Sequence, residues 1–353
     1  MNPIKVLVVD DSALMRRIIS DLLKSDPGII VVGTAKNGQE AIEIIPKLQP
    51  DVLTLDIEMP VLNGLEALPM IWRKYKIPTI MLSSLTQDGA EATIQALELG
   101  AFDFVGKPSG SISLDLAKVG DELLAKVKAA AKKEQIVKST HYFKPLPKPI
   151  PAPPKPVPTG KRVHEIIAIG TSTGGPRALQ VVLSHLPASL PAPVVVVQHM
   201  PPGFTKSLSQ RLDHLCQVRV HEAEDGQVLE EGHVYIAPGD RHMRVIETKP
   251  GLYQIRLGLE PPLGGHRPAV DVLFDSLAEL SSVRLRAAIL TGMGGDGANG
   301  MVKIKAQGGL TIAEAQESCV VFGMPRTAIA KGCVDVVVPL DRVADELKKP
   351  WKR

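Results

Sequence analysis

A proline-rich segment near the middle of the chain constrains the fold more than any other feature. Eight of the fourteen residues 145–158, PLPKPIPAPPKPVP, are proline. Proline fixes φ and lacks an amide hydrogen, so this segment can be neither a helix nor a central strand. An extended spacer of roughly 40 Å is its expected state, and a ligand for a proline-recognising domain is the alternative. Because the 353 residues exceed the roughly 250–300 of a single core, two domains joined by this linker are predicted.

Charge, hydropathy and cysteine spacing exclude several classes of protein. The 41 basic and 38 acidic residues are too evenly balanced to predict a nucleic-acid partner. No apolar run approaches the roughly 20 residues that cross a bilayer, and the N-terminus MNPIKVLVVDDS is no secretory signal. The cysteines Cys216, Cys319 and Cys333 are far apart, which favours neither a disulfide framework nor a zinc site. We therefore expect a cytoplasmic protein without direct membrane insertion.

In the first half of the chain, short apolar runs alternate with amphipathic stretches. Strands are predicted at residues 4–9, 29–35, 51–55, 77–82 and 102–105. Helices are predicted at residues 12–24, 38–48, 64–75, 88–99 and 114–133. Five strand–helix units with almost continuously apolar strands predict a parallel sheet that is covered on both faces, a doubly wound and flavodoxin-like α/β domain.

The same alternation resumes after the proline-rich segment. Strands are predicted at residues 165–169, 193–198, 216–220, 286–290, 310–313 and 334–338. Residues 232–257 have a different pattern, HVYIAPGDRHMRVIE…GLYQIRL, which predicts antiparallel hairpin material. The second half is therefore expected to be a Rossmann-like, doubly wound parallel-sheet α/β domain with an antiparallel hairpin insertion.

Charged and hydroxyl side chains follow the strands of the first predicted sheet. The first strand ends at Asp10 and Asp11, the third at Asp56, the fourth at Ser83 and the fifth at Lys107. In an open parallel sheet, ligands collect at the carboxyl ends of the strands. Clustered carboxylates repel one another unless a cation joins them, and Mg²⁺ is a suitable cation. Asp56 is then a candidate nucleophile for a phosphoryl group, although these aspartates can also simply cap the following helices.

Residues 1–125 resemble a response-regulator receiver domain, with VVDDS, LTLDIEMPVLNG, MLSSLT and FVGKP in order. The resemblance implies that Asp56 is the phosphorylation site. It implies a metal site formed by Asp10, Asp11, Asp56 and the backbone of Glu58. It also implies the receiver-switch positions Ser83, Phe104 and Lys107. Phe104 lacks the hydroxyl that many receivers carry at its position.

Three motifs of the second half place reactive side chains directly after apolar strands. Ser172 lies in GTSTGGP, His199 in VQHMPPGFT and Asp296 in LTGMGGDGA. GTSTG fits the GxSxG pattern of a serine on a tight strand-to-helix turn. The three side chains are the components of a Ser–His–Asp triad. GTSTGGP can alternatively be a phosphate-binding or purely structural turn, His199 a hydrogen-bonding residue and Asp296 a helix cap.

The chain order Ser, His, Asp differs from that of α/β-hydrolases. The three motifs, behind a receiver and a linker, resemble the CheB family of chemotaxis protein-glutamate methylesterases. This resemblance implies a receiver at 1–125, a helix end and linker at 126–162, and a catalytic domain at 163–349. It implies the catalytic residues Ser172, His199 and Asp296, with Thr173 and the backbone amide of Met293 near the oxyanion.

The resemblance also implies the function, which is adaptation in chemotaxis signalling. It implies a phosphorylation-activated hydrolase that demethylates glutamate methyl esters on methyl-accepting chemoreceptors and, like many relatives, also deamidates glutamines there. The chemotaxis histidine kinase is the implied phosphodonor. Mg²⁺ is implied in the receiver, and no cofactor is implied for ester hydrolysis. There are two alternatives. One is a receiver with a DNA-binding or protein-binding output domain, and the other is a triad esterase that acts on another modified protein.

Overall fold

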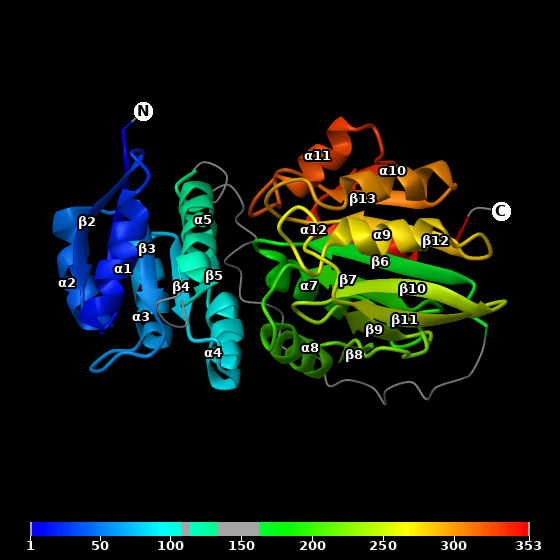
Figure 1. Ribbon diagram of the computed structural model, residues 1–353, viewed down its shortest axis with the longest axis horizontal. Helices are drawn as coiled ribbons and strands as arrows, with labels where there is room; N and C mark the ends of the chain where they lie inside the picture. The colour runs from blue at the N-terminus through cyan, green and yellow to red at the C-terminus, as the bar shows by residue number, and fades with distance from the viewer. Residues whose placement is uncertain (1, 108–112, 133–161, 352–353) are drawn as a thin grey trace. The chain divides into compact units, whose positions relative to one another are not determined.

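The computed structural model describes residues 2–107, 113–132 and 162–351. It divides into two compact units, Met1–Lys138 and Ser139–Arg353 (Figure 1). The proline-rich segment 145–158 lies outside the described residues, so its predicted extended state stays a prediction. Each unit is described by itself below.

The first unit contains a five-stranded parallel sheet in the order β2-β1-β3-β4-β5. Its strands are β1 (Ile4–Val9), β2 (Ile29–Ala35), β3 (Val52–Asp56), β4 (Thr79–Ser83) and β5 (Asp103–Gly106). This strand order is the flavodoxin-like one, which confirms the predicted fold. Strands β3 and β4 end at the polar residues Asp56 and Ser83. The apolar runs of the sequence predicted that each strand ends one residue earlier. Both side chains are therefore held rigidly by the sheet.

Five helices cover the two faces of this sheet. They are α1 (Ala13–Lys24), α2 (Gly38–Leu48), α3 (Gly64–Tyr75), α4 (Gln87–Glu98) and α5 (Ser113–Ala130). Helix α1 packs against α5, whereas α3 packs against α2 and α4, so the two groups lie on opposite faces. The side chains of Ser12, Asn37, Asn63 and Thr86 accept hydrogen bonds from the first turns of α1 to α4. Such N-caps satisfy amides that have no partner within the helix.

The second unit contains a seven-stranded parallel sheet in the order β14-β13-β12-β6-β7-β9-β8. Its strands are β6 (Glu165–Thr171), β7 (Val194–Gln198), β8 (Arg219–Glu222), β9 (His233–Ile236), β12 (Arg284–Ile289), β13 (Leu310–Glu314) and β14 (Val336–Val338). The chain leaves β6 for β7 on one side and later returns as β12 on the other. This reversal creates a topological switch point, where ligands bind in doubly wound sheets.

The antiparallel hairpin is present but shorter than predicted. It consists of β10 (His242–Lys249) and β11 (Leu252–Gly258), which form a separate two-stranded sheet. The prediction of hairpin material over 232–257 was wrong for its first part, because β9 joins the main sheet between β7 and β8. All four residues of β9 are buried, as expected for a central parallel strand, whereas β10 becomes progressively exposed along its length.

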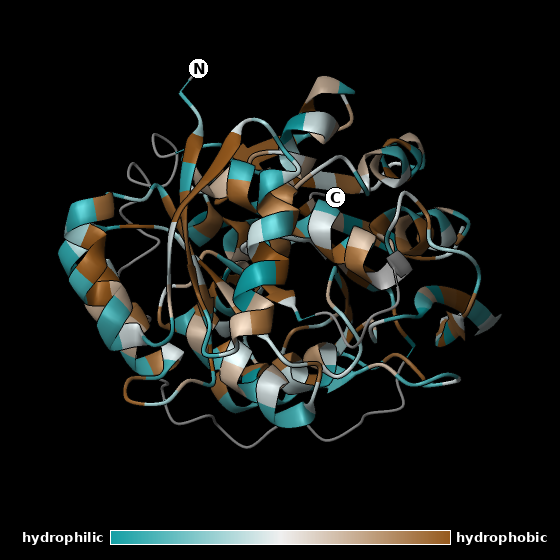
Figure 2. Ribbon diagram, turned by 60° about the vertical axis from the view of Figure 1, so that its left-hand side comes forward, coloured by the Kyte–Doolittle hydropathy of each residue, from teal (hydrophilic) through white to brown (hydrophobic). Residues whose placement is uncertain are grey.

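Helices and apolar strand residues form the core of the second unit. The helices are α7 (Gly175–Ser184), α8 (Phe204–Leu215), α9 (Val270–Ala278), α10 (Ala298–Ala306), α11 (Met324–Ala330) and α12 (Leu340–Lys348). Figure 2 shows that the strands are largely hydrophobic, whereas the helices carry both hydrophilic and hydrophobic residues. Within the described residues, no helix is long and apolar enough to span a membrane.

The amino ends of β6 and β12 are joined by a buried ion pair that also fastens the end of the chain. The guanidinium of Arg286 pairs with Glu165 and donates to the carbonyl oxygens of Glu346 and Lys349. The indole nitrogen of Trp351 donates to the other Glu165 oxygen over 2.6 Å, and its ring centroid lies 4.8 Å from the Arg286 guanidinium. Arg286 is 2% exposed. The terminal segment up to Trp351 is thus part of the folded unit.

We expect Arg286→Ala to lower the free energy of unfolding of the second unit by about 3–5 kcal/mol, because it leaves the Glu165 carboxylate buried without its cation. The exposed neighbour Arg284 provides the matched control, and Arg284→Ala should cost less than about 1 kcal/mol. Urea unfolding in a Trp72→Phe background reports on this unit, since Trp351 is then the one remaining tryptophan. Equal losses for the two variants would contradict the assigned role of the buried pair.

Candidate active site and acidic metal site

The three predicted triad residues lie at the carboxyl ends of the adjacent strands β12, β6 and β7. Ser172 directly follows β6, and its amide donates to the carbonyl of Thr291 after β12 over 3.1 Å. His199 directly follows β7, and its amide donates to the carbonyl of Thr171 over 3.2 Å. The side-chain amide of Gln198 donates to the carbonyls of both Ser172 and His199, each over 3.0 Å. The switch point of the sheet therefore positions these loops side by side.

His199 and Asp296 form a direct hydrogen-bonded pair. His199 Nε2 lies 2.8 Å from Asp296 Oδ2, and the two side chains are only 7% and 11% exposed. Asp296 also accepts hydrogen bonds from the amides of Val270 and Asp271, over 2.6 and 2.9 Å. These amides belong to the first turn of α9, where backbone N–H groups have no partner within the helix.

The surroundings of Asp296 keep its carboxyl ionised. Burial acts to raise the pKa of Asp296, but the hydrogen bond and charge of His199, together with the two amides of α9, outweigh it and hold the pKa below its ordinary value. An ionised acid on Nε2 favours the imidazole tautomer that carries its proton on that nitrogen. Nδ1 is then the basic nitrogen of His199.

His199 Nδ1 is buried and has no hydrogen-bond partner among the described residues. Nδ1, the ring nitrogen that does not contact Asp296, is thus the one that can take a proton. No hydrogen bond within the described chain joins the Ser172 hydroxyl to this nitrogen, and catalytic contacts of this kind often tighten only around a substrate. The structure brings the three side chains to one edge of the sheet and pairs two of them directly.

Two glycine-rich loops are tied together beneath Ser172. Thr171 Oγ1 donates to the carbonyl of Thr291, and Thr291 Oγ1 donates to the carbonyl of Thr173, each over 2.9 Å. A Cβ atom on Gly292 would lie 2.9 Å from Ser172 Cβ and 2.3 Å from Met324 Sδ. Only glycine therefore permits this close approach of the loops.

The two predicted near-site residues lie in these same loops. Thr173 is buried directly after Ser172. Met293 is partly exposed in the loop between β12 and α10, and its amide donates no hydrogen bond to the described residues. The preceding residue, Gly292, lies against Ser172, so Met293 belongs to the loop beside the serine.

Sequence reasoning missed several residues that hold the site together. Gln198 ends an apolar strand, and a buried polar residue next to a candidate base is a signal that could have identified it. Glu314, at the end of β13, accepts hydrogen bonds from the Thr291 amide and the Ser318 hydroxyl, and burial raises its pKa to about 7. The sequence carries no signal for His266, yet its ring stacks on that of His199.

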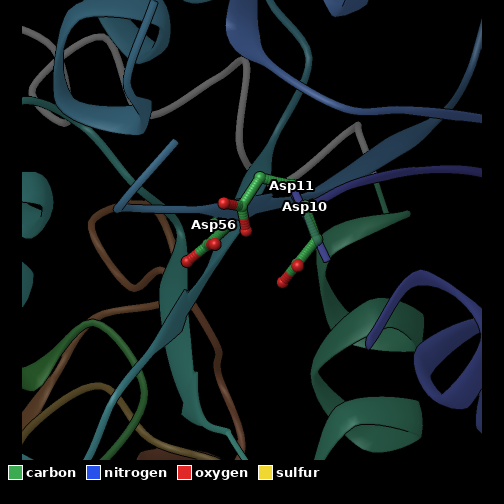
Figure 3. A group of neighbouring side chains, drawn as sticks. All are labelled: Asp10, Asp11 and Asp56. Atoms are coloured by element: carbon green, nitrogen blue, oxygen red, sulfur yellow. The ribbon is translucent and has the colours of Figure 1, made fainter. Parts of the chain in front are cut away.

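The predicted acidic cluster of the first unit is present. Asp10, Asp11 and Asp56 each place a carboxylate oxygen within 4.8 Å of the others (Figure 3). Asp10 and Asp56 are buried, whereas Asp11 is exposed. Lys107 Nζ lies 2.9 Å from Asp10 Oδ2 and 2.7 Å from Asp56 Oδ2. A single lysine thus faces two buried carboxylates.

This cluster suits a hard divalent cation. Burial raises the pKa of Asp56 to about 6, in spite of the opposing hydrogen bonds from Lys107 and the Glu58 amide, and the charge of Asp10 adds to the rise. Asp10 Oδ2 and Asp56 Oδ2 are both buried, and each contacts Lys107 Nζ. Buried carboxylate oxygens of this kind are the ligands that Mg²⁺ prefers.

The predicted switch residues lie around the same strand ends. Ser83 Oγ donates to the carbonyl of Gly89 over 3.0 Å and accepts from Thr93 Oγ1 over 2.7 Å, so it is engaged with α4. A cavity of about 20 Å³ is lined by Asp56, Ile57, Glu58, Ser83, Ser84, Gly89 and Lys107. Phe104 is buried, and Lys126 Nζ lies 5.1 Å from its ring centroid.

Comparisons with known proteins agree with this architecture. The family model described as CheB methylesterase matches residues 167–347, and that of the response regulator receiver domain matches residues 6–117. A protein-glutamate methylesterase/protein-glutamine glutaminase of Geobacillus kaustophilus is 54% identical over 98% of this chain and 97% of its own. A protein of the same description from Bacillus subtilis is 48% identical over 99% of both chains.

A solved structure is similar to the second unit. The CheB methylesterase catalytic domain of Thermotoga maritima is 48% identical, with a TM-score of 0.50. It covers 52% of this chain and 97% of its own length.

The raised pKa of Asp56 predicts a pH-dependent cost to the first unit. The native state binds the Asp56 proton more tightly than the unfolded state does. The protonated Asp56 therefore stabilises the folded unit fully below about pH 4, and this stabilisation is lost as the pH rises through about 6. Asp56→Asn should therefore raise the free energy of unfolding by about 1–3 kcal/mol at pH 8 and have almost no effect below pH 4.

Urea unfolding in a Trp351→Phe background, with a chelator present, isolates this unit through Trp72 fluorescence. Asp21→Asn on α1 is the matched control, because Asp21 is 66% exposed and its change should stay below about 0.5 kcal/mol. An Asp56→Asn variant that is no more stable than wild type at pH 8 would count against the buried charge.

Proposed function

Because this chain belongs to the CheB methylesterase family and also carries a response regulator receiver domain, we propose that it demethylates glutamate methyl esters and deamidates glutamines on methyl-accepting chemoreceptors. The proposed catalytic residues are Ser172, His199 and Asp296. The observation that carries this proposal is the buried His199–Asp296 hydrogen bond, with Ser172 on the neighbouring strand end. We place the catalytic domain at 163–349, the receiver at 1–125 and the helix end and linker at 126–162.

The proposed reaction follows from the free ring nitrogen of His199. Ser172 Oγ attacks the acyl carbon of the ester while His199 Nδ1 takes the hydroxyl proton. Asp296 stabilises the imidazolium through Nε2, which is the role of the acid in Ser–His–Asp systems. His199 then gives the proton to the departing methoxide, so methanol leaves and an acyl-enzyme remains. Water attacks this ester with His199 again as base, and the free glutamate and Ser172 are regenerated.

The same steps account for glutamine deamidation. The leaving group is then the amide nitrogen, which departs as ammonia after receiving the proton from His199. In both reactions a negative charge develops on the acyl oxygen. The amide of Met293 and the loop carrying Thr173 are the proposed donors to this oxygen, and loss of one such donor typically reduces the rate by about 10²–10³-fold.

Control is proposed to come from phosphorylation of Asp56 by the chemotaxis histidine kinase. The Asp56 carboxylate attacks the phosphorus atom of the kinase's phosphohistidine, and the imidazole of that histidine departs as the P–N bond breaks. Lys107 is placed to pair with the phosphoryl oxygens after giving up its contact with Asp56. Mg²⁺ held by Asp10, Asp11, Asp56 and the Glu58 backbone would neutralise phosphoryl charge. Ser83 must exchange its bond to Gly89 for the phosphoryl group, which couples the site to α4. The compartment implied is the cytoplasm.

We expect Ser172→Ala to reduce methanol release from methyl-labelled chemoreceptor membranes by at least about 10³-fold, because no other described group replaces the nucleophile. Ser184→Ala, at the other end of α7, is the matched control and should retain wild-type activity. Phosphorylation of Asp56 should be unchanged in both variants. Substantial methanol release by Ser172→Ala would refute the assigned nucleophile.

Asp56→Asn should abolish the stimulation of methanol release by a small-molecule phosphodonor while it preserves the unstimulated rate. The stimulation is lost because the asparagine amide cannot accept the phosphoryl group. The unstimulated rate is kept because residue 56 is not part of the proposed hydrolytic site. Release is measured with and without phosphodonor in the presence of Mg²⁺, and Asp21→Asn serves as the control. Equal stimulation of wild type and Asp56→Asn would contradict control through this residue.

A further inference from the structure

The loop between β11 and α9 places a second imidazole against the proposed base. The ring centroids of His199 and His266 are 3.9 Å apart and the ring planes differ by 9°, so the two rings are stacked face to face. His199 Nε2 is taken by Asp296, and Nδ1 is the nitrogen without a partner. His266 thus covers one face of the His199 ring, while Nδ1 at the ring edge keeps no hydrogen-bond partner in the described chain.

Several contacts hold this loop in place. The Arg267 guanidinium donates twice to Asp240 Oδ1, over 2.6 and 2.9 Å, and also to the carbonyls of Leu259 and Glu260. Leu263 and His266 exchange two backbone hydrogen bonds of 3.0 Å. The loop conformation is therefore determined by many bonds at once.

The same segment also fixes the acid. Residues 267–269 lead directly from His266 into α9, whose first amides, those of Val270 and Asp271, bind Asp296. One continuous stretch of chain thus contacts the imidazole of His199 through a ring face and the carboxylate of Asp296 through two amides. The charged groups identified beside the stacked pair are Asp296 and the mutually paired Arg267 and Asp240.

We propose that His266 is a positioning residue, which acts on the reaction through His199. This proposal rests on the proposed function. Its ring holds the plane of the His199 imidazole so that Nδ1 stays directed toward the nucleophile. Its π face also stabilises the imidazolium that forms when His199 takes the serine proton, as aromatic faces do for cations. An aromatic ring without titratable nitrogens can perform both tasks.

The test uses the full-length chain and methyl-labelled chemoreceptor membranes. His266→Ala should lower kcat by about 3- to 30-fold with little change in KM. It should also move the acid limb of the pH–rate profile about 0.4–1 unit toward lower pH, because the imidazolium loses stabilisation. His266→Phe should recover kcat to within about threefold of wild type and restore the position of the acid limb.

His214→Ala is the matched control. His214 is an exposed histidine in the last turn of α8, roughly 15 Å along the helix from its first residue, Phe204. It should leave both kcat and the pH profile unchanged. Circular dichroism and thermal unfolding of each variant establish that the fold is intact.

Two results overturn the inference: a His266→Ala variant with wild-type kcat and an unmoved acid limb, or a His266→Phe variant as impaired as His266→Ala. The Ser172→Ala variant separates this failure from that of the proposed function. If Ser172→Ala still releases methanol, the function assigned to the site is wrong. If only the His266 series disagrees, the positioning role alone is lost.

Discussion

The proposed chemistry depends on keeping a buried carboxylate charged. Asp296 has little exposure to water, and burial by itself would favour its neutral form. Two amides at the start of α9 and the imidazole of His199 supply the compensating hydrogen bonds. Because these donors come from different parts of the chain, the set of hydrogen bonds that keeps the buried Asp296 charged exists only in the folded domain. The tautomer of His199, and with it the identity of the basic nitrogen, follows from that charge.

Sheet topology explains why three distant segments meet. Ser172 and His199 follow consecutive strands, but Asp296 lies 97 residues after His199. The reversal of strand order between β6 and β12 returns the chain to the correct edge, beside the loop that carries Ser172. The first unit uses the same rule on a second sheet, where strand ends gather Asp10, Asp56 and Lys107. Two doubly wound sheets thus support different chemistries at equivalent edges.

Most of the architecture could be predicted from the sequence because parallel strands have long apolar runs and their polar ends mark a sheet edge. The hairpin boundary could not, since His233–Ile236 reads equally well as a hairpin arm or a central strand until its burial is known. Nor could His266 be identified, because a histidine in a glycine- and proline-rich loop carries no periodic signal. The orientation of His199, with Asp296 on Nε2, requires coordinates.

The account is tested most directly by mapping the covalent adduct of a serine-directed fluorophosphonate by mass spectrometry, with its formation rate measured against pH. The account predicts a single adduct on Ser172 that forms much more slowly when His199 is replaced by glutamine, since the hydroxyl must lose its proton to that ring. An adduct on another residue, or labelling of Ser172 at the same rate without the imidazole, would contradict it.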